Sequence, residues 1–254
     1  MAKRQAATSP DYIKWLLLAG AAIVIVVLAA VAARRYILPH SVAVDRLRYP
    51  IAGIDVSNHN GTIDFDSVRD DNYQFVLIKA SEGKTFKDPA FGRHYGGARA
   101  AGLKVGAYHF FRKNRTGEEQ AANFLDVIGN RTLDLPLVID LEDDWGNGAT
   151  TSYDTAVERL LNMIAILKGK GYSVMIYTNK DGYNKYYKDM LGDCDLWLCS
   201  FTSPDLLDLP HRFQQYSYEG EVDGVDGEVD LNVFRGDRSD WEHYLEQVNR
   251  PAGQ

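Results

Sequence analysis

The sequence predicts an α/β fold: an irregular TIM-like β/α barrel with eight strands and an incomplete helix ring, preceded by one transmembrane helix. Three observations lead to this prediction. An uncharged apolar run lies near the N-terminus, eight short β-rich runs follow it, and helical patterns separate most of the earlier runs. Strands that alternate with helices are typical of a parallel sheet, and about 200 residues suit one barrel domain.

The transmembrane helix is predicted at 15–33, where 19 consecutive residues carry no charge. At 1.5 Å per residue this helix is roughly 28 Å long, close to the thickness of a bilayer's hydrocarbon core. Trp15 at one edge and Arg34-Arg35 at the other are typical of membrane interfaces. The alternative is a cleaved signal peptide with a site at Ala30-Val31-Ala32, but signal peptides have shorter apolar runs. An uncleaved signal anchor is therefore favoured.

This segment divides the chain into four parts. Residues 1–14 form a short N-terminus, 15–33 the anchor, 34–49 a linker, and 50–250 the barrel domain. No internal repeat or low-complexity stretch interrupts the last part, which fits a single domain.

Eight β-rich runs are the candidate strands of the barrel. They are Ile51–Val56, Phe75–Ala80, Lys104–Phe110, Leu137–Leu141, Ser173–Tyr177, Leu196–Phe201, Arg212–Tyr216 and Val229–Val233. The loops between the last runs are too short for full crossover helices, so the barrel should be irregular. An open doubly wound sheet is the main alternative fold.

Helix start signals lie between the first strand candidates. Asp88-Pro89 supplies an N-cap and a first-turn proline for a helix that Gly102 can end. Thr116 and Glu119 form a capping-box pattern ahead of a second helix.

Two further helices are predicted nearer the C-terminus. Tyr153–Lys168 has apolar residues at 157, 160, 161, 164 and 167, which form one helical face, and Gly169 can end it. Ser239 with Glu242 starts a last short helix.

Composition and charge exclude several classes of protein. With 45% apolar residues, 25% charged residues, 22 Gly and 8 Pro, the chain is neither disordered nor collagen-like. Residues 1–48 hold seven of the 28 Lys and Arg but only two of the 35 Asp and Glu, which leaves a net charge of −12 on the rest. A surface this acidic repels a phosphate backbone, and no basic stripe relieves it. We therefore expect no nucleic-acid partner.

The two cysteines, Cys194 and Cys199, are too few for a cysteine-ligated zinc framework. On a strand, positions i and i+5 stand about 17 Å apart, which is beyond disulfide reach. We expect two separate buried thiols.

Carboxylates at the ends of predicted strands are the candidate functional residues. Asp55 follows the first β-rich run, and Asp140 and Glu142 end the run PLVIDLE. On a strand, i and i+2 point to the same side, so Asp140 and Glu142 face one space. In a parallel barrel the carboxyl ends of the strands carry the active site. Asp230 begins its predicted strand, which places it at the opposite end unless a boundary shift or bulge brings it inward.

Several carboxylates in one pocket suit acid catalysis. Like charges in a low-dielectric cleft raise the pKa of one carboxyl, which leaves a proton donor beside an anion. Cleavage of a glycosidic bond needs both. Two other interpretations stay open: acids that cap helices or lie in solvated loops, and a site for Mg²⁺ or Ca²⁺. The acidic run 219–230 lacks the twelve-residue calcium-loop pattern and is interpreted as a flexible loop. We predict no metal and no cofactor.

Other polar and aromatic residues carry weaker signals. His59 and His109 are 50 residues apart without a third partner and are interpreted as structural. Four aromatic residues near strand ends can stack on sugar rings or fill the core: Tyr108, Tyr177, Trp197 and Tyr216. The sequence has no GxSxG elbow, phosphate loop or dinucleotide fingerprint.

Seven stretches together make the chain resemble the lysozyme-type glycoside hydrolases of family 25, the N-acetylmuramidases that cut peptidoglycan. They occur in family order over about 50–235 and read GIDVSNHNGTIDF, FVLIKASEGKTFKDPAF, ARAAGLKVGAYHFFR, PLVIDLED, VMIYTN, LWLCSF and GVDGEVDLNVF. The paired acids of DLE and the final GEVDLNVF make the resemblance specific.

The resemblance implies an irregular β/α barrel whose groove, at the carboxyl ends of the strands, holds an acidic quartet. By position, Glu142 would be the general acid and Asp140 would assist at the anomeric centre, while Asp55 and Asp230 complete the quartet. The residues implied to bind substrate are Tyr108, Tyr177, Gln215 and Tyr216.

Two departures from the family pattern concern substrate preference more than catalysis. Gln214 stands where the family commonly has Trp, which removes an aromatic platform near the groove. Asn60 replaces a glutamine in the first motif, which is a mild change.

The leading hypothesis is a membrane-anchored muramidase that hydrolyses the β-1,4 bond between N-acetylmuramic acid and N-acetylglucosamine. Retaining chemistry assisted by the substrate's acetamido group is favoured, although the sequence leaves the stereochemistry open. The alternatives are a non-catalytic module that binds cell-wall glycan and, with less support, a metal-dependent hydrolase that uses the same carboxylates.

The expected partners follow from this hypothesis. They are the glycan strands of peptidoglycan and, through the N-terminal helix, membrane lipid; the sequence is silent on oligomeric state. Because peptidoglycan lies outside the inner membrane, residues 1–14 should be cytoplasmic and the catalytic domain should lie on the extracytoplasmic side, in the periplasm or cell wall.

Overall fold

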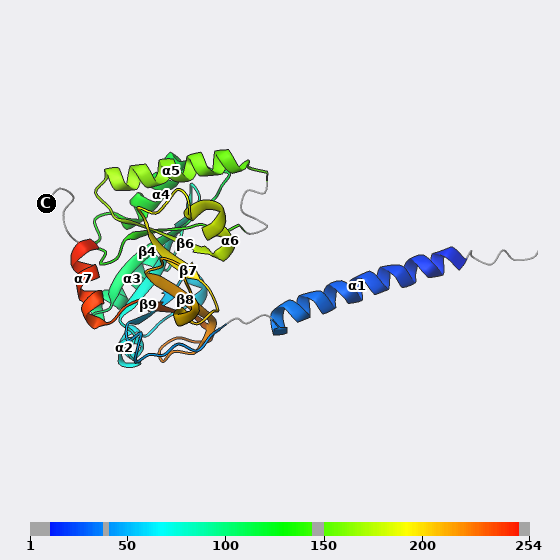
Figure 1. Ribbon diagram of the computed structural model, residues 1–254, viewed down its shortest axis with the longest axis horizontal. Helices are drawn as coiled ribbons and strands as arrows, with labels where there is room; N and C mark the ends of the chain where they lie inside the picture. The colour runs from blue at the N-terminus through cyan, green and yellow to red at the C-terminus, as the bar shows by residue number, and fades with distance from the viewer. Residues whose placement is uncertain (1–10, 38–40, 144–149, 249–254) are drawn as a thin grey trace, which may run out of the picture. The chain divides into compact units, whose positions relative to one another are not determined.

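The computed structural model of the 254-residue chain describes residues 11–37, 41–143 and 150–248, with side chains of the N-terminal helix described for 13–27. The chain separates into two units, residues 1–39 and 40–254 (Figure 1). Each unit is described by itself.

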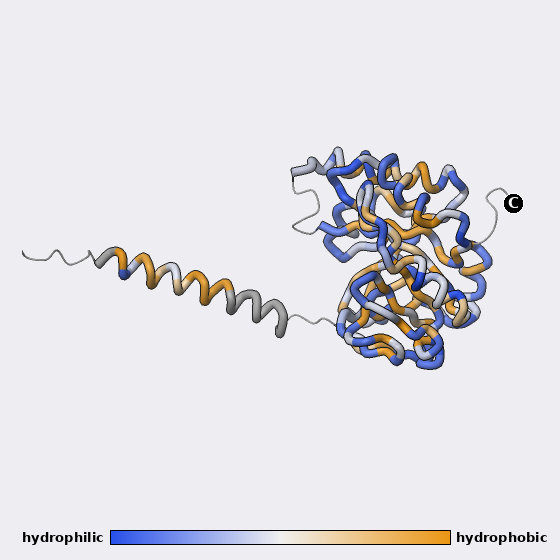
Figure 2. Tube along the Cα trace, turned by 180° about the vertical axis from the view of Figure 1, so that it is seen from behind, coloured by the Kyte–Doolittle hydropathy of each residue, from blue (hydrophilic) through white to orange (hydrophobic). Residues whose placement is uncertain are grey.

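The described residues of the first unit form one long helix, α1 (Asp11–Ile37), of 27 residues. Its described large apolar side chains are exposed, with Trp15 71% exposed and Leu17 70% exposed. Figure 2 colours the backbone of the hydrophobic residues in this helix orange. Within the part of the chain that the structure describes, no helix is long and apolar enough to cross a membrane. Residues 28–33 of the predicted anchor lie outside the residues whose side chains are described.

The second unit is built on a closed β-barrel. Its described residues form nine strands: β1 (Ala52–Val56), β2 (Phe75–Glu82), β3 (Phe86–Lys87), β4 (Lys104–Phe110), β5 (Leu137–Asp140), β6 (Val174–Asn179), β7 (Asp195–Cys199), β8 (Phe213–Gly220) and β9 (Val229–Phe234). Eight of them close in the order β1-β2-β4-β5-β6-β7-β8-β9, with β9 paired back onto β1, while β3 extends β2 as a hairpin. This closure confirms the predicted eight-stranded barrel and excludes the open doubly wound sheet.

The last strand runs in the opposite direction to the others. Strands β1, β2 and β4 to β8 pair in parallel, whereas β9 is antiparallel to both β8 and β1. The amino-terminal end of β9 therefore lies at the carboxyl ends of the parallel strands. The strand-end argument that would have placed Asp230 at the opposite end does not hold, because it assumed a parallel last strand; the antiparallel direction of β9 brings Asp230 to the end that the family resemblance implied. In the register, Asp230 lies directly opposite Asp55.

Helices cover only part of the barrel (Figure 1). Three longer ones follow strands in the first two-thirds of the domain: α3 (Phe91–Ala100), α4 (Gly117–Ile128) and α5 (Tyr153–Gly169). A fourth longer helix, α7 (Arg238–Val248), follows β9, and the remaining described helical elements of this unit are short: α2 (Phe65–Asp70), α6 (Lys180–Gly182), and the turns η1 (Asn58–Asn60), η2 (Tyr183–Tyr187) and η3 (Pro204–Leu206). Among the described residues no helix joins β8 to β9. The predicted incomplete helix ring is confirmed.

Local signals explain where these helices begin. Thr116 and Glu119 form the predicted capping box at the start of α4, since each side chain binds the other residue's backbone N–H. Helix α3 begins at Phe91, slightly later than Asp88-Pro89 predicts, because the Asp88 carboxylate accepts hydrogen bonds from the backbone N–H of Asn58 and Ala90. Asp88 thus ties α3 to the turn that follows β1.

Alternating side chains divide the core into two layers. On β2, Phe75 and Leu77 point into the barrel, while Val76 and Ile78 pack under the outer helices. The interior is apolar near the amino-terminal ends of the strands and is closed there by α7 (Arg238–Val248). Trp241 of α7 lies 5.6 Å from Phe75 and 5.1 Å from Phe234, measured between ring centroids. The polar residues inside the barrel are therefore confined to its other end.

Replacement of Trp241 by alanine tests the closure of the barrel. The indole is 6% exposed and contacts three interior aromatic rings, so Trp241→Ala should lower the free energy of unfolding by about 3–5 kcal/mol. Chemical denaturation of the full chain measures this loss. Glu242→Ala, which changes the exposed neighbour on the same helix, should change stability by less than about 0.5 kcal/mol. Equal effects of the two substitutions would contradict this role of α7.

Candidate active site

The polar end of the barrel opens into a cavity of about 200 Å³ at the carboxyl ends of the parallel strands. All four carboxylates of the predicted quartet line it. The lining residues are Asp55, Ser57, His59, Lys79, Tyr108, Phe110, Asp140, Glu142, Tyr177, Trp197, Gln215 and Asp230. Of the four residues predicted to bind substrate, Tyr108, Tyr177 and Gln215 are among them.

Strand periodicity explains how the acids reach one space. Asp140 ends β5 on the same face as Val138, whose side chain belongs to the barrel interior. Glu142 follows two residues later and is half-buried. Asp55 of β1 and Asp230 of β9 face each other across the antiparallel pair. The carboxylates therefore come from three strands that are separate in sequence.

Two amide side chains hold Asp55. The Asn232 Nδ2 donates to Asp55 Oδ2 at 2.8 Å, and the Gln215 Nε2 donates to the same oxygen at 2.9 Å. Gln215 Nε2 also lies 3.3 Å from Asp230 Oδ2. Both Asp55 and Asn232 are buried, at 7% and 0% exposed. Asp55 thus receives two donors on one oxygen, which favours its ionised form.

Aromatic donors fix the orientation of these amides. Tyr177 donates its hydroxyl to Gln215 Oε1 at 2.6 Å, and Trp197 donates its indole N–H to Asn232 Oδ1 at 2.8 Å. Each amide oxygen is therefore occupied by a group that can only donate there, and each NH₂ must face the carboxylates. The network leads from the apolar interior to the acidic pair.

The Asp55–Asp230 pair holds a proton at neutral pH. Burial raises the pKa of Asp230 to about 9, and repulsion from the Asp55 carboxylate contributes to the increase. Burial also raises the pKa of Asp55, to about 6, while the hydrogen bonds from Asn232 and Gln215 oppose that increase. The two groups share a hydrogen bond and titrate as a pair. Because burial raises both pKa values and the two carboxyl groups repel each other when both are charged, the pair retains one shared proton near neutral pH.

Tyr108 and Tyr177 stay protonated in this cavity. Burial raises the pKa of each phenol well above its usual value, and nearby acids add to the increase, among them Asp140 in both cases. Tyr177 also packs against Trp197, with 4.4 Å between ring centroids. These two phenols therefore supply hydroxyl groups and ring faces to the cavity wall.

Tyr216 does not line the cavity. It directly follows Gln215 on β8, so its side chain points to the other side of the sheet and packs in the outer core layer.

His109 also lies on the outer side of the sheet, where it hydrogen-bonds Ser81 Oγ at 2.8 Å and packs against Phe124. Its structural interpretation is confirmed, whereas His59 is exposed at the cavity rim. Cys194 and Cys199 are both free and buried, as predicted.

The sequence prediction missed Asn232, which holds Asp55 from behind the cavity, and Lys79, which lines the cavity. Asn232 lies two residues after Asp230, and Lys79 lies two residues after the inward-facing Leu77. The same period of two that places Asp140 beside Glu142 points to both of them. Extending the periodicity along β2 and β9 would have found them.

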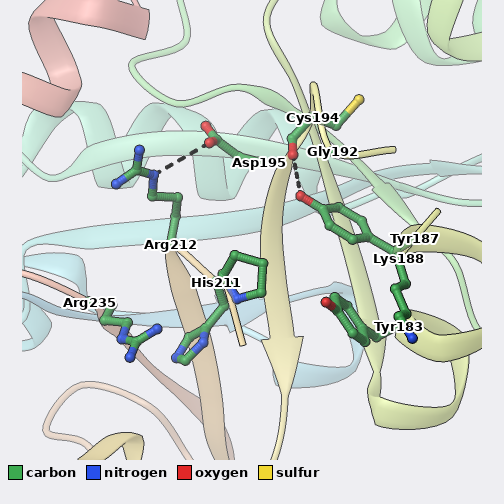
Figure 3. A pocket seen from close by; sticks show the side chains of 10 residues that line it. Tyr183, Tyr187, Lys188, Gly192, Cys194, Asp195, His211, Arg212 and Arg235 are labelled. Atoms are coloured by element: carbon green, nitrogen blue, oxygen red, sulfur yellow. Dashed lines mark hydrogen bonds and ion pairs between the residues drawn. The ribbon is translucent and has the colours of Figure 1, made fainter. Parts of the chain in front are cut away.

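A larger cavity of about 500 Å³ lies near the amino-terminal ends of β7 and β8 (Figure 3). Among its described lining residues Asp195 is the one acid, and its carboxylate accepts from the Tyr244 hydroxyl at 2.9 Å and pairs with Arg212. Figure 3 shows this pair on one side and Lys188 on the other, with His211 between them in the view. A single acid that is already paired offers no acid–anion couple, so the smaller acidic cavity is the candidate active site.

The acids of the cavity do not form a ready metal centre. No group of three or more His, Cys, Asp and Glu side chains with metal-holding geometry occurs within 41–143 and 150–248 or the described part of α1. Asp55 is already engaged by two amide donors. What the geometry offers is a set of carboxyl groups in different protonation states.

Comparison with known proteins identifies the family. The profile of Glycosyl hydrolases family 25 matches residues 54–225, which include Asp55, Asp140 and Glu142. The chain belongs to glycosyl hydrolase family 25. Asp230 lies just beyond the matched range, and its pairing with Asp55 joins it to the same site.

Curated relatives and solved structures agree with this family 25 assignment. The chain is 35% identical over 187 residues to an autolytic lysozyme of Clostridium acetobutylicum, which covers 72% of this chain and 55% of that protein, so the chain spans about half of that relative's length. It is 34% identical to lysozyme M1 of Streptomyces globisporus, covering 73% and 68% of the two chains. A family 25 glycosyl hydrolase from Bacillus anthracis matches with a TM-score of 0.73 at 34% identity, covering 81% and 97%.

The raised pKa of Asp230 predicts a pH-dependent cost to the stability of the family 25 domain. Between its ordinary value near 4 and the folded value of about 9, the folded chain holds this proton and the unfolded chain loses it, so stability falls as pH rises. Asp230→Asn removes this titration. The variant should gain at least about 1 kcal/mol over the wild type on going from pH 5 to pH 8.

Chemical denaturation at the two pH values measures that gain. Asp226→Asn, which neutralises an exposed acid near the start of β9, is the matched control and should show no such gain. A constant difference between wild type and Asp230→Asn at both pH values would show that the pair holds no proton.

Proposed function

We propose that the protein is a peptidoglycan hydrolase, an N-acetylmuramidase that cleaves the β-1,4 bond between N-acetylmuramic acid and N-acetylglucosamine. The observation that carries the proposal is the single cavity lined by Asp55, Asp140, Glu142 and Asp230. Family membership and the lysozyme names of two relatives support it. Glycosidic cleavage requires an acid for the leaving oxygen and an anion near the anomeric carbon, and this cavity supplies carboxyl groups for both.

The positions of the two central acids suit different roles. Glu142 is half-buried just beyond the end of β5, where a leaving-group oxygen at the mouth of the barrel can reach it. It acts as the general acid that protonates this oxygen. Asp140 is 6% exposed and lies deeper in the cavity, where an anion stabilises positive charge that develops at the anomeric centre.

The Asp55–Asp230 pair supports these roles because its shared proton lowers the negative charge of the cavity. Four ionised carboxylates in one small cavity would repel one another, and the shared proton removes one of those charges. The Tyr108 and Tyr177 hydroxyls add neutral donors at the wall. Retention through participation of the substrate's own acetamido group fits this arrangement, with Asp140 positioned to stabilise the oxazolinium ion.

Glu142→Gln tests the proposed general acid. Glutamine keeps the shape of the side chain but cannot donate the proton, so kcat on purified peptidoglycan should fall by about 10²–10⁴-fold while glycan binding persists. Hydrolysis by the full chain in EDTA, with borohydride reduction of the products, shows whether muramic acid forms the new reducing ends. Glu219→Gln, a conservative change of an acid that does not line the cavity, is the matched control.

Each outcome has a distinct meaning. New muramic-acid reducing ends from the wild type and the control alone support the muramidase with Glu142 as its acid. No new ends, from a folded chain that sediments with peptidoglycan, would replace the proposal with a non-catalytic glycan-binding module. Activity that is lost in EDTA and restored by Mg²⁺ would replace it with a metal-dependent hydrolase.

We also propose that residues 15–33 anchor the chain in a membrane, with the N-terminus cytoplasmic and the barrel on the extracytoplasmic side. The support is the run of 19 uncharged residues and the exposed apolar side chains over 13–27, which need an apolar environment. The orientation follows from the location of peptidoglycan. An anchor confines hydrolysis to wall within reach of the membrane.

Membrane extraction and protease accessibility test the anchor. The full chain should stay in the membrane pellet after alkaline extraction, and protease added to intact spheroplasts should degrade the barrel. A variant with Val24→Lys and Val26→Lys, which places two charges in the apolar run, should be released. Release of an intact wild-type chain, or a mature N-terminus just after Ala32, would contradict the anchor.

A further inference from the structure

One wall of the acidic cavity is basic. Among the described residues that line the cavity, Lys79 is the one Lys or Arg. It lies near the carboxyl end of β2, on the face that Phe75 and Leu77 present to the barrel interior, and its side chain is 14% exposed. A cation this well covered, beside four carboxyl groups, needs an explanation beyond solubility.

The Lys79 ammonium forms an ion pair with Glu82, but this pair does not use all of its hydrogen-bond donors. It donates to Glu82 Oε2 at 2.8 Å and lies 5.2 Å from the ring centroid of Phe110 and 5.6 Å from that of Phe86. An ammonium has three N–H donors, and the described residues supply it with one carboxylate acceptor, Glu82. Donors are therefore left for a group that enters the cavity.

Glu82 does not neutralise this wall. Its other oxygen accepts from Arg112, from Nε at 2.9 Å and from the terminal nitrogen at 2.6 Å. Two cations thus share one anion, and the wall keeps a net positive charge of about one. Arg112 does not itself line the cavity, so Lys79 presents that charge to a ligand.

A positive wall matters for a substrate that carries a carboxylate. Such a group is repelled by the anionic carboxylates of the cavity and is attracted to the Lys79 ammonium. Sugar hydroxyls and acetamido groups are neutral and do not require a charged donor. The chemistry of the wall therefore selects an acidic glycan over a neutral one.

We propose that Lys79 binds a carboxylate of the glycan and determines the preference of this site for acidic strands that contain muramic acid. This inference rests on the proposed function and goes beyond it, because it names the substrate group and the residue that recognises it. The carboxylate belongs either to the lactyl group of muramic acid or to the attached peptide stem. The two sources share one chemistry, and separate substrates distinguish them.

The experiment measures KM and kcat of the full chain on three substrates. They are peptide-free glycan strands with free lactyl carboxylates, the same strands after methyl esterification, and strands that retain their peptide stems. Lys79→Met should raise KM about tenfold for carboxylate-bearing strands, which is what loss of one charged hydrogen bond produces, and leave KM for the esterified strands unchanged. The kcat should change little.

Two variants separate recognition from a structural role. Lys79→Arg keeps the charge and should retain the preference for acidic strands. Arg112→Gln removes the other cation paired with Glu82 and lowers the charge of the wall, but it leaves the Lys79 donors at the cavity, so it should reduce that preference less than Lys79→Met does. Thermal unfolding of each variant identifies any loss of folding.

The outcomes are decisive in both directions. An effect of Lys79→Met on peptide-free strands assigns the lactyl carboxylate, and an effect confined to stem-bearing strands assigns the peptide; both support the proposal. An equal rise in KM for free and esterified strands, no rise at all, or an equal loss of preference in Arg112→Gln would overturn it. Failure of the wild type to cleave any strand would instead refute the proposed function.

Discussion

The antiparallel pairing of β9 with β1 is the constraint on which the site depends. It closes the barrel and also turns the start of β9 toward the carboxyl ends of the parallel strands, so that Asp230 lies opposite the buried Asp55. Two acids in that position cannot both be ionised at neutral pH without a large cost, and one of them holds a proton. A parallel last strand would have carried Asp230 to the other end of the barrel.

Packing at the amino-terminal end of the barrel fixes the positions of the polar side chains at the carboxyl end. Trp241 and the interior aromatic rings fill the amino-terminal end, and Trp197 connects that apolar layer to the polar one through its indole N–H. From there Asn232 and Gln215 aim their amide groups at Asp55. The orientation of the Asp55 carboxyl is thus set by core packing, since each of its amide hydrogen-bond partners is itself held by a buried aromatic ring.

Much of this arrangement could be predicted from the sequence. The two-residue periodicity of a strand places Asp140 and Glu142 on one face, and both line the cavity. The capping residues Thr116 and Glu119 predict the start of α4 where the structure has it. The direction of β9 could not be predicted in the same way, because Val229–Phe234 reads as an alternating strand in either direction and its orientation follows from the barrel closure. The position of Tyr216 depends on the register of β8, where one residue decides between cavity and outer layer.

The arrangement of the site requires that the Asp55–Asp230 pair share one proton near neutral pH. Carbon-13 NMR of the full chain with labelled aspartate side chains measures this directly, because the carboxyl shift reports protonation. One aspartyl carboxyl signal should stay protonated at pH 7, titrate only at higher pH, and be absent in Asp230→Asn. Full ionisation of every aspartate at pH 7, or a protonated carboxyl that persists in Asp230→Asn, would contradict it.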